Sequence, residues 1–103
     1  MSVLMEFAMF PTDKGASVSE YVSKIIEMIR SQTPHYKLTA MGTIIETETM
    51  EESLAILQNA YNILSPYSKR IYSSVKFDIR KGHSDRLNQK IKSIEKRIGD
   101  VNK

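Results

Sequence analysis

The chain has 103 residues, of which 41% are hydrophobic and 26% charged, and its formal net charge is +3. These values are typical of one globular domain, here residues 1–103, and exclude fibrous and disordered classes. The absence of cysteine excludes a disulfide framework and thiolate metal sites, and no apolar run is long enough to span a membrane. We therefore expect a cytoplasmic protein with no membrane partner.

The first two predicted elements are a strand and a helix. Residues 3–10 alternate in polarity, which predicts a strand that ends at Pro11. Ser17, followed three residues later by Glu20, is a capping-box signature, and apolar residues then recur at helical spacing. The pattern predicts a helix over residues 18–32 that is capped by Ser17.

A hairpin and a second helix follow. Residues 36–41 and 43–48 predict two strands, and Gly42 between them favours a tight turn or a bulge. Thr49 begins a second capping box, and the apolar stripe after it stops near Pro66. The sequence therefore predicts a helix between these two residues.

The last two elements are a strand and a third helix. Residues 71–80 predict the fourth strand, which Gly82 ends. Ser84 can cap the following helix, whose apolar residues have a 4, 3, 4, 3 spacing: Leu87, Ile91, Ile94, Ile98 and Val101. This spacing is typical of a helix that packs lengthwise on an apolar surface.

The order of these elements predicts an α+β fold of the ferredoxin-like βαββαβ type, with an extra C-terminal helix. Its antiparallel sheet would have the spatial order four, one, three, two, and the first two helices would cover one face only. The other face would be half apolar, with Leu4, Ala8, Phe10, Ile44 and Tyr72. Because such a face usually pairs with another subunit, we expect a homo-oligomer.

Basic residues are concentrated at the C-terminal end of the chain. Residues 1–68 hold 4 basic and 8 acidic side chains, whereas residues 69–103 hold 11 basic and 4 acidic ones. Such an excess can attract a polyanion. The basic residues of the last helix, however, have the spacing of a solvated face, with no aromatic side chains among them for base stacking. We expect no nucleic-acid partner.

Three carboxylates interrupt the apolar strand patterns: Glu6, Glu46 and Asp78. The predicted strand order gathers them on the open face, where Lys76 and Arg80 also lie. Asp78 and Arg80 could form an ion pair in the floor of a site, or a contact between subunits. For Glu6 we expect a structural pairing with Lys76 or Arg80, because an unpaired carboxylate on a covered central strand would be costly.

Three segments together carry a resemblance to a known family: residues 17–22 (SVSEYV), 38–46 (LTAMGTIIE) and 77–82 (FDIRKG). In order and spacing they resemble the thiamine-binding protein family of small ferredoxin-like proteins. The resemblance implies a homotetramer that binds thiamine or its hydroxymethylpyrimidine part, without established catalysis. The chain has Thr47 where many relatives have glycine, so its backbone can come less close to a ligand there.

Thiamine joins an aminopyrimidine to a cationic thiazolium, so a binder needs hydrogen-bond partners for the first ring and an anionic or electron-rich neighbour for the second. Glu46 is the candidate carboxyl group and Thr43 its candidate hydroxyl partner. These residues are three apart, so their side chains converge only if the Gly42 region bulges. We expect Met41 to be core or interface filler first; the alternative is that Met41 and Phe10 line an apolar slot beside a ring.

The complete candidate ligand-binding set is Glu46, Thr43, Asp78, Arg80, Glu6 and Ser17. Ser17 is first a helix cap and second a ligand contact at the helix N-terminus. We expect no catalytic residue and no cofactor other than thiamine as ligand. The two histidines, His35 and His83, lie in or beside loops without cysteine, so we expect no metal site.

Two alternative functions remain open at this stage. The first is a small ferredoxin-like enzyme that uses Glu46 or Asp78 as a general base, which requires a raised carboxyl pKa in a closed pocket. The second is a regulatory or interaction protein without a small ligand, which the apolar stripe of the last helix favours.

Overall fold

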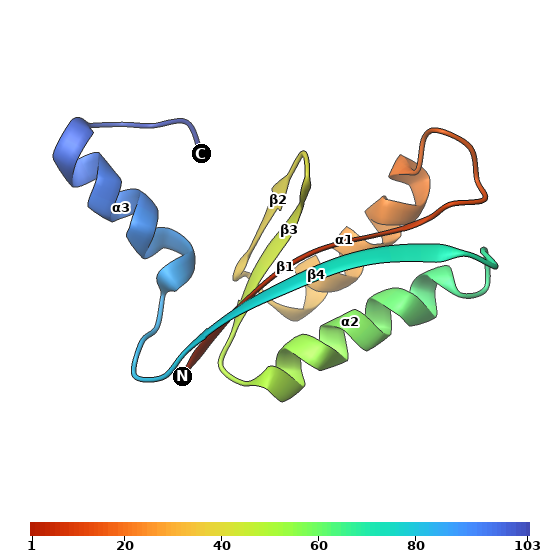
Figure 1. The fold of residues 1–103 in the computed structure, drawn as a ribbon, viewed down its shortest axis with the longest axis horizontal. Coiled ribbons are helices and arrows are strands. Elements are labelled where there is room, and N and C mark those ends of the chain that lie inside the picture. Colours follow the sequence, from red (N-terminus) through yellow and green to blue (C-terminus); the bar gives the residue numbers. More distant parts are fainter.

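The computed structural model describes residues 1–103 and contains four strands and three helices. In chain order they are β1 (Ser2–Pro11), α1 (Ser19–Gln32), β2 (Tyr36–Thr39), β3 (Gly42–Thr47), α2 (Met50–Leu64), β4 (Ile71–Arg80) and α3 (Arg86–Ile98). α1 and α2 lie on one side of the sheet, and α3 projects from one end (Figure 1). This is the predicted ferredoxin-like α+β fold with an extra C-terminal helix. None of the helices is long and apolar enough to cross a lipid bilayer.

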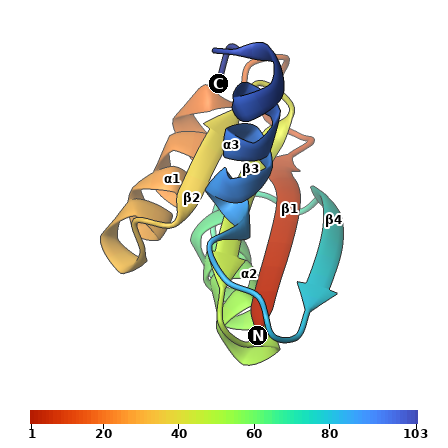
Figure 2. The same cartoon turned by 90° about the vertical axis from the view of Figure 1, so that its left-hand side faces the viewer.

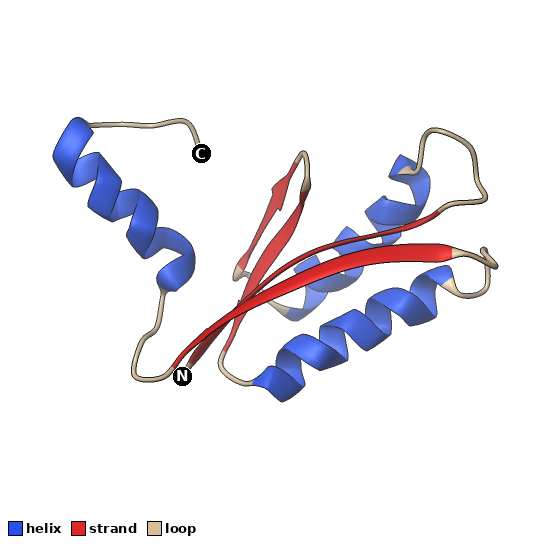
Figure 3. Cartoon of the chain, in the orientation of Figure 1, coloured by secondary structure: helices blue, strands red, loops and turns tan.

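The sheet is antiparallel and has the predicted order β2-β3-β1-β4. Its strands are drawn in red in Figure 3. β1 pairs with β4 along all of its residues, Ser2–Pro11. It pairs with β3 only from Val3 to Phe7, because β3 begins at the turn of the β2–β3 hairpin, beside Phe7. The last part of β1 therefore has a strand on one side only.

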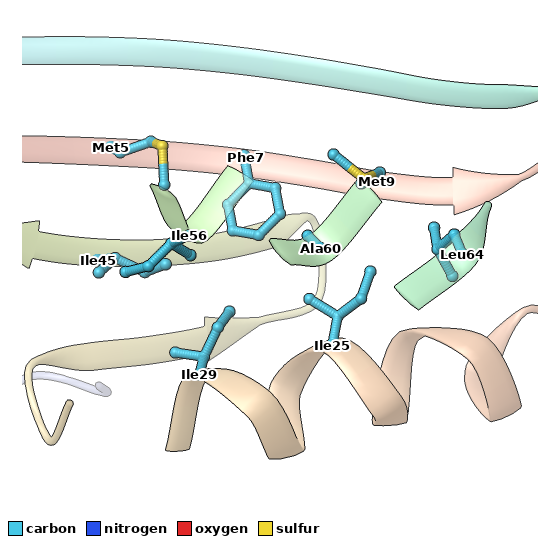
Figure 4. Close-up of a cluster of buried hydrophobic side chains, with 9 residues drawn as sticks. All are labelled: Met5, Phe7, Met9, Ile25, Ile29, Ile45, Ile56, Ala60 and Leu64. Atoms are coloured by element: carbon cyan, nitrogen blue, oxygen red, sulfur yellow. The ribbon is translucent and has the colours of Figure 1, made fainter. Parts of the chain in front are cut away.

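The hydrophobic core lies between the sheet and the two helices. Alternate residues of β1 point toward the helices, and Figure 4 shows how they meet side chains from α1, α2 and β3. The cluster consists of Met5, Phe7, Met9, Ile25, Ile29, Ile45, Ile56, Ala60 and Leu64. Burying one large apolar side chain contributes about 1.5–3 kcal/mol, so this cluster determines which face of the sheet the helices cover.

The opposite face of the sheet is open, as predicted. The alternate residues of β1 on that side, Leu4, Glu6, Ala8 and Phe10, are only half-buried. The ring of Phe10 packs on that of Tyr72, with 5.5 Å between their centroids.

The helix starts follow the sequence pattern only in α2. There the backbone N–H of Glu52 donates to the Thr49 hydroxyl at 3.1 Å, which confirms Thr49 as the N-cap. The cap that we predicted from Ser17 is wrong, because α1 begins two residues later, at Ser19, without a side-chain cap. The predicted Ser84 cap is also wrong, because Asp85 occupies the N-cap of α3 in a left-handed conformation, with φ of 52°.

α3 is anchored at its first turn rather than along its length. Arg86, Leu87 and Asn88 are half-buried, whereas Ile94 and Ile98 are exposed. Figures 1 and 2 agree that the helix runs away from the layer formed by α1 and α2. The sequence predicted that the apolar stripe of α3 packs lengthwise on an apolar surface. The chain itself does not supply such a surface along the helix.

Candidate functional site

Glu6 lies on the open face of the central strand, directly opposite Lys76 of β4. The Lys76 Nζ atom is 3.5 Å from Oε1 of Glu6. The predicted structural pairing is therefore present. Because both side chains are well exposed to water, this ion pair contributes little stability, and the Glu6 carboxylate stays accessible.

Glu46 caps the third helix. One carboxylate oxygen, Oε1, accepts a hydrogen bond from the backbone N–H of Leu87 at 2.9 Å. The other, Oε2, accepts one from the backbone N–H of Arg86 at 3.0 Å and one from the Ser2 hydroxyl at 2.5 Å. The first N–H groups of a helix have no partner within it, so Glu46 from β3 takes the place of a local cap.

Arg86 joins this arrangement through its side chain, which is only 10% exposed. Its Nε atom donates to the Ser2 hydroxyl at 2.9 Å, and Nη2 donates to the backbone carbonyls of Ser2, at 2.8 Å, and Asp78, at 2.5 Å. Its Nη1 atom is 3.2 Å from Oδ1 of Asp78. We call Ser2, Glu46, Asp78 and Arg86 the polar clasp.

The clasp corrects one prediction and adds two residues. Asp78 pairs with Arg86, a residue in the first turn of α3, and not with Arg80. Arg80 is exposed and lies opposite Ser2 in the sheet. Ser2 and Arg86 had no signal in the sequence, since neither interrupts a pattern and their partners are distant along the chain.

The pKa of Glu46 is lower than that of an ordinary glutamate. Burial alone would raise it, but the hydrogen bonds from Ser2, Leu87 and Arg86 and the charge of Arg86 outweigh the burial. A general base for proton transfer needs a raised carboxyl pKa. The environment of Glu46 therefore does not fit the enzymatic alternative.

Thr43 and Glu46 lie on opposite faces of β3. The pairing of β1 with β3 runs without a bulge from Val3 opposite Thr47 to Phe7 opposite Thr43. Thr43 points toward the helices and is 5% exposed, whereas Glu46 points to the open face. The convergence that required a bulge near Gly42 is absent, so one small ligand cannot contact both side chains directly within one chain.

A hollow of about 220 Å³ lies where β1 passes the end of β3, and 11 of its 14 lining residues are hydrophobic. We call it the apolar slot. Its lining includes Phe7, Met9, Phe10, Val18, Met41 and Thr43. Met41 and Phe10 both line it, which is the alternative to Met41 serving as filler. Ser17 does not line it, although its neighbour Val18 does.

The slot also has a polar edge. Ala8, Met9 and Phe10 line it, and they pair with β4 but not with β3. At the edge that has no neighbour, every second residue of such a strand presents a free backbone N–H and C=O. An aminopyrimidine carries an amine donor next to a ring nitrogen acceptor, which is the complementary pattern.

Glu6 is the candidate acid that lies beside this slot. A Cβ atom placed on Gly42, which lines the slot, would be 3.8 Å from Cγ of Glu6. The same Cβ would be 3.0 Å from the Phe7 carbonyl oxygen, so the hairpin approaches β1 closely there because residue 42 is glycine.

A second, larger hollow of about 610 Å³ lies at the opposite end of β1, next to Met1. Four acids line it, Glu46, Glu48, Glu52 and Asp85, together with His35. No three of the chain's acids and histidines are arranged to hold a metal ion. Glu46 lines this larger hollow, whereas Thr43 and Glu6 lie at or near the apolar slot. The predicted ligand residues are thus divided between the two ends of β1.

Comparison with known proteins gives consistent results over nearly the whole chain. A family model described as "Thiamine-binding protein" matches residues 5–95. A UPF0045 protein of Methanocaldococcus jannaschii is 35% identical over 92 residues, which cover 89% of this chain and 91% of that protein. A UPF0045 protein of Mycobacterium tuberculosis is 32% identical over 96 residues, or 93% and 94% of the two chains.

Solved structures show the same fold. A crystal structure of the Methanocaldococcus protein has a TM-score of 0.80 at 34% identity and covers 90% of this chain and 95% of its own. A Thermotoga maritima protein, described as a candidate thiamine biosynthesis/salvage protein, has a TM-score of 0.77 at 20% identity and covers 91% and 99%. At that identity the second likeness supports the fold alone.

Proposed function

Because this chain belongs to the thiamine-binding protein family, we propose that it is a non-catalytic binding protein for thiamine or a related aminopyrimidine. The observation that carries the proposal is the apolar slot with its unpaired strand edge. The slot offers apolar walls for a flat ring, and the edge offers a donor and an acceptor for the ring's amine and nitrogen. Nothing in this arrangement calls for bond breaking.

In this proposal the aminopyrimidine ring lies between Phe10 and Met41. The backbone of Ala8 to Phe10 accepts from the amine and donates to a ring nitrogen, while the Thr43 hydroxyl faces the slot from the helix side. The cationic thiazolium extends over the open face toward Glu6. Glu6 can attract it because its ion pair with Lys76 is loose and exposed.

This arrangement changes the roles of the other predicted ligand residues. Glu46 and Asp78 hold α3 through the polar clasp, so we propose that they support the fold rather than touch the ligand. We further propose a cytoplasmic homotetramer that assembles through the half-apolar open face and the strand edges.

Calorimetric titration at neutral pH tests the ligand proposal. Thiamine and hydroxymethylpyrimidine are both expected to release or absorb heat and to raise the melting temperature. Absence of heat and of a thermal shift at millimolar ligand would reject the proposal.

A variant distinguishes the two parts of the ligand. Glu6→Gln is expected to weaken thiamine binding by about two- to five-fold, since an exposed charge interaction contributes up to about 1 kcal/mol. Binding of the uncharged hydroxymethylpyrimidine should not change. Glu51→Gln, an exposed acid on α2, is the matched control. Equal weakening of both ligands would show that Glu6 does not face the cation.

A further inference from the structure

β4 forms a bare outer edge of the sheet (Figure 2). All ten of its residues pair with β1 in unbroken register, and no strand pairs on its other side. The strand Ile71–Arg80 contains neither proline nor glycine. A long, regular edge of this kind is a ready template for another strand, and natural proteins rarely leave one uncovered.

Apolar side chains extend along this edge beyond the cover of the helices. Phe77 is 37% exposed and Ile79 is 48% exposed, although both point to the helix side of the sheet. Val75, in the same row, is only partly buried. The edge therefore has unsatisfied backbone groups and an uncovered apolar row at the same place.

We propose that β4 pairs with β4 of a second copy of the chain, antiparallel, about a two-fold axis at Phe77. The two sheets then form one continuous sheet of eight strands, with the helices of both copies on the same side. This inference deepens the proposed homo-oligomer by specifying one of its interfaces, and it does not depend on whether thiamine binds.

Charge complementarity selects this register. With the axis at Phe77, Lys76 of each copy lies directly opposite Asp78 of the other. Directly opposed residues of an antiparallel pair interact, and opposite charges there are favourable. Lys76 and Asp78 are 78% and 74% exposed, so a second copy can reach both charged groups in addition to their partners within the chain, Glu6 and Arg86.

The apolar row fits the same register. Phe77 lies opposite Phe77 of the second copy, and Val75 lies opposite Ile79. Aromatic and β-branched residues in these positions stabilise a strand pair. The second copy would then cover Phe77 and Ile79 at the free edge of β4, where no other part of the chain packs against them.

Neighbouring registers lack this match, except an axis at Ile79, which opposes Asp78 and Arg80 but pairs only residues 78–80 of β4. An axis at Lys76 places that lysine opposite itself, and an axis at Asp78 places like charges opposite each other twice, because Lys76 then meets Arg80. An axis at Val75 avoids repulsion but opposes no pair of opposite charges. An axis between two residues would set the apolar row of one copy against the charged row of the other, with the helices on opposite sides.

Disulfide trapping tests the register, and the absence of native cysteine makes single-cysteine variants unambiguous. Phe77→Cys is expected to form a disulfide-linked dimer on oxidation, because opposed Cα atoms are about 4.5–5.5 Å apart. Val75→Cys and Ile79→Cys are each expected to remain unlinked alone, since like positions are about 14 Å apart along the strands. A mixture of the two should link as a heterodimer.

Charge exchange tests the same register without altering the apolar row. Lys76→Asp and Asp78→Lys are each expected to halve the mass of the assembly in light scattering, and the double exchange should restore it. Because the double exchange still lacks the intrachain pairs of Lys76 with Glu6 and of Asp78 with Arg86, a restored mass would report the contact between copies. Lys92→Asp, an exposed lysine of α3, is the matched control. An unchanged mass in both single variants, or linkage of Val75→Cys with itself, would overturn the register.

The outcomes separate this inference from the ligand proposal. A protein that binds thiamine but does not link at residue 77 would contradict the β4 interface alone. A protein that links at residue 77 but shows no heat with thiamine would contradict the ligand alone. A monomer that binds thiamine would contradict both the interface and the proposed oligomer.

Discussion

At the scale of single residues, Glu46 and Arg86 determine where α3 is held. The carboxylate supplies the cap that the loop before α3 lacks, and the guanidinium fixes the same turn to β1 and β4. The nearly buried guanidinium has partners on three sides, which offsets the cost of removing a charge from water. The Ser2 hydroxyl links the two side chains, because it donates to the Glu46 carboxylate and accepts from Nε of Arg86.

The pH dependence of this anchor follows from the direction of the Glu46 pKa shift. The pKa is lower in the folded protein than the usual value of 4.5, so the folded state prefers the ionised carboxylate. The stabilisation is fully present above about pH 4.5 and is lost as the pH falls through the lower folded pKa. We expect the first amides of α3 to exchange hydrogen faster in that acid range.

Glu46→Gln tests this prediction. The glutamine side chain keeps one oxygen that can accept from the backbone N–H groups but has no charge. We therefore expect the hydrogen-exchange protection of the first backbone amides of α3 to fall by about 1 kcal/mol. Their protection should also no longer depend on pH in the acid range. Glu48→Gln, an exposed neighbour in the sequence, is the control. A pH profile unchanged by Glu46→Gln would show that another group controls the anchor.

At the scale of elements, the β2–β3 hairpin shapes the apolar slot. The hairpin ends where β1 continues, so its turn and the free edge of β1 form two sides of one hollow. Gly42 permits this geometry through its lack of a side chain, because its φ is not in the left-handed region. A side chain there would meet the β1 backbone.

Gly42→Ala is expected to lower the free energy of unfolding by about 1–3 kcal/mol, because the new Cβ would lie 3.0 Å from the Phe7 carbonyl oxygen and the hairpin must move. It should also weaken aminopyrimidine binding by changing the slot. Urea unfolding and calorimetry measure the two effects. Full stability and full binding in this variant would contradict the close approach.

Many elements could be predicted from the sequence, and the reasons for the exceptions are physical. Alternation in residues 3–10 and 71–80 was sufficient to place every side chain on its correct face, because core burial fixes the register. The cap of α3 could not be predicted from nearby residues, since its acceptor, Glu46, comes from another strand. The pairing of Asp78 with Arg86 depends on how α3 leaves the sheet, which local patterns do not encode.

The candidate site was predictable in its parts but not in its grouping. An apolar slot lined by Met41 and Phe10 was one of two alternatives, and the structure places both residues along one hollow. Glu46 was expected beside a ligand, and in the structure it caps α3 at the edge of the larger hollow, a role that the sequence did not predict. The spacing of residues along a strand determines which face of the sheet each side chain lies on. The position of α3 determines which acidic side chains on that face have no partner within the chain.

At the scale of the whole molecule, apolar surface remains exposed in three places: the open sheet face, the edge at β4 and the stripe of α3. Exposed apolar surface of this extent is typical of proteins that associate. We expect light scattering to give about four times the chain mass of 11.8 kDa. A mass equal to one chain at micromolar concentration would contradict the tetramer.

The polar clasp joins residues that are far apart along the chain, since 84 positions separate Ser2 from Arg86. Closing so long a loop costs conformational entropy, which these hydrogen bonds can offset only after the sheet has brought the strands together. The clasp therefore cannot start folding. The anchoring of α3 depends on nearly all of the preceding chain having already reached its native arrangement.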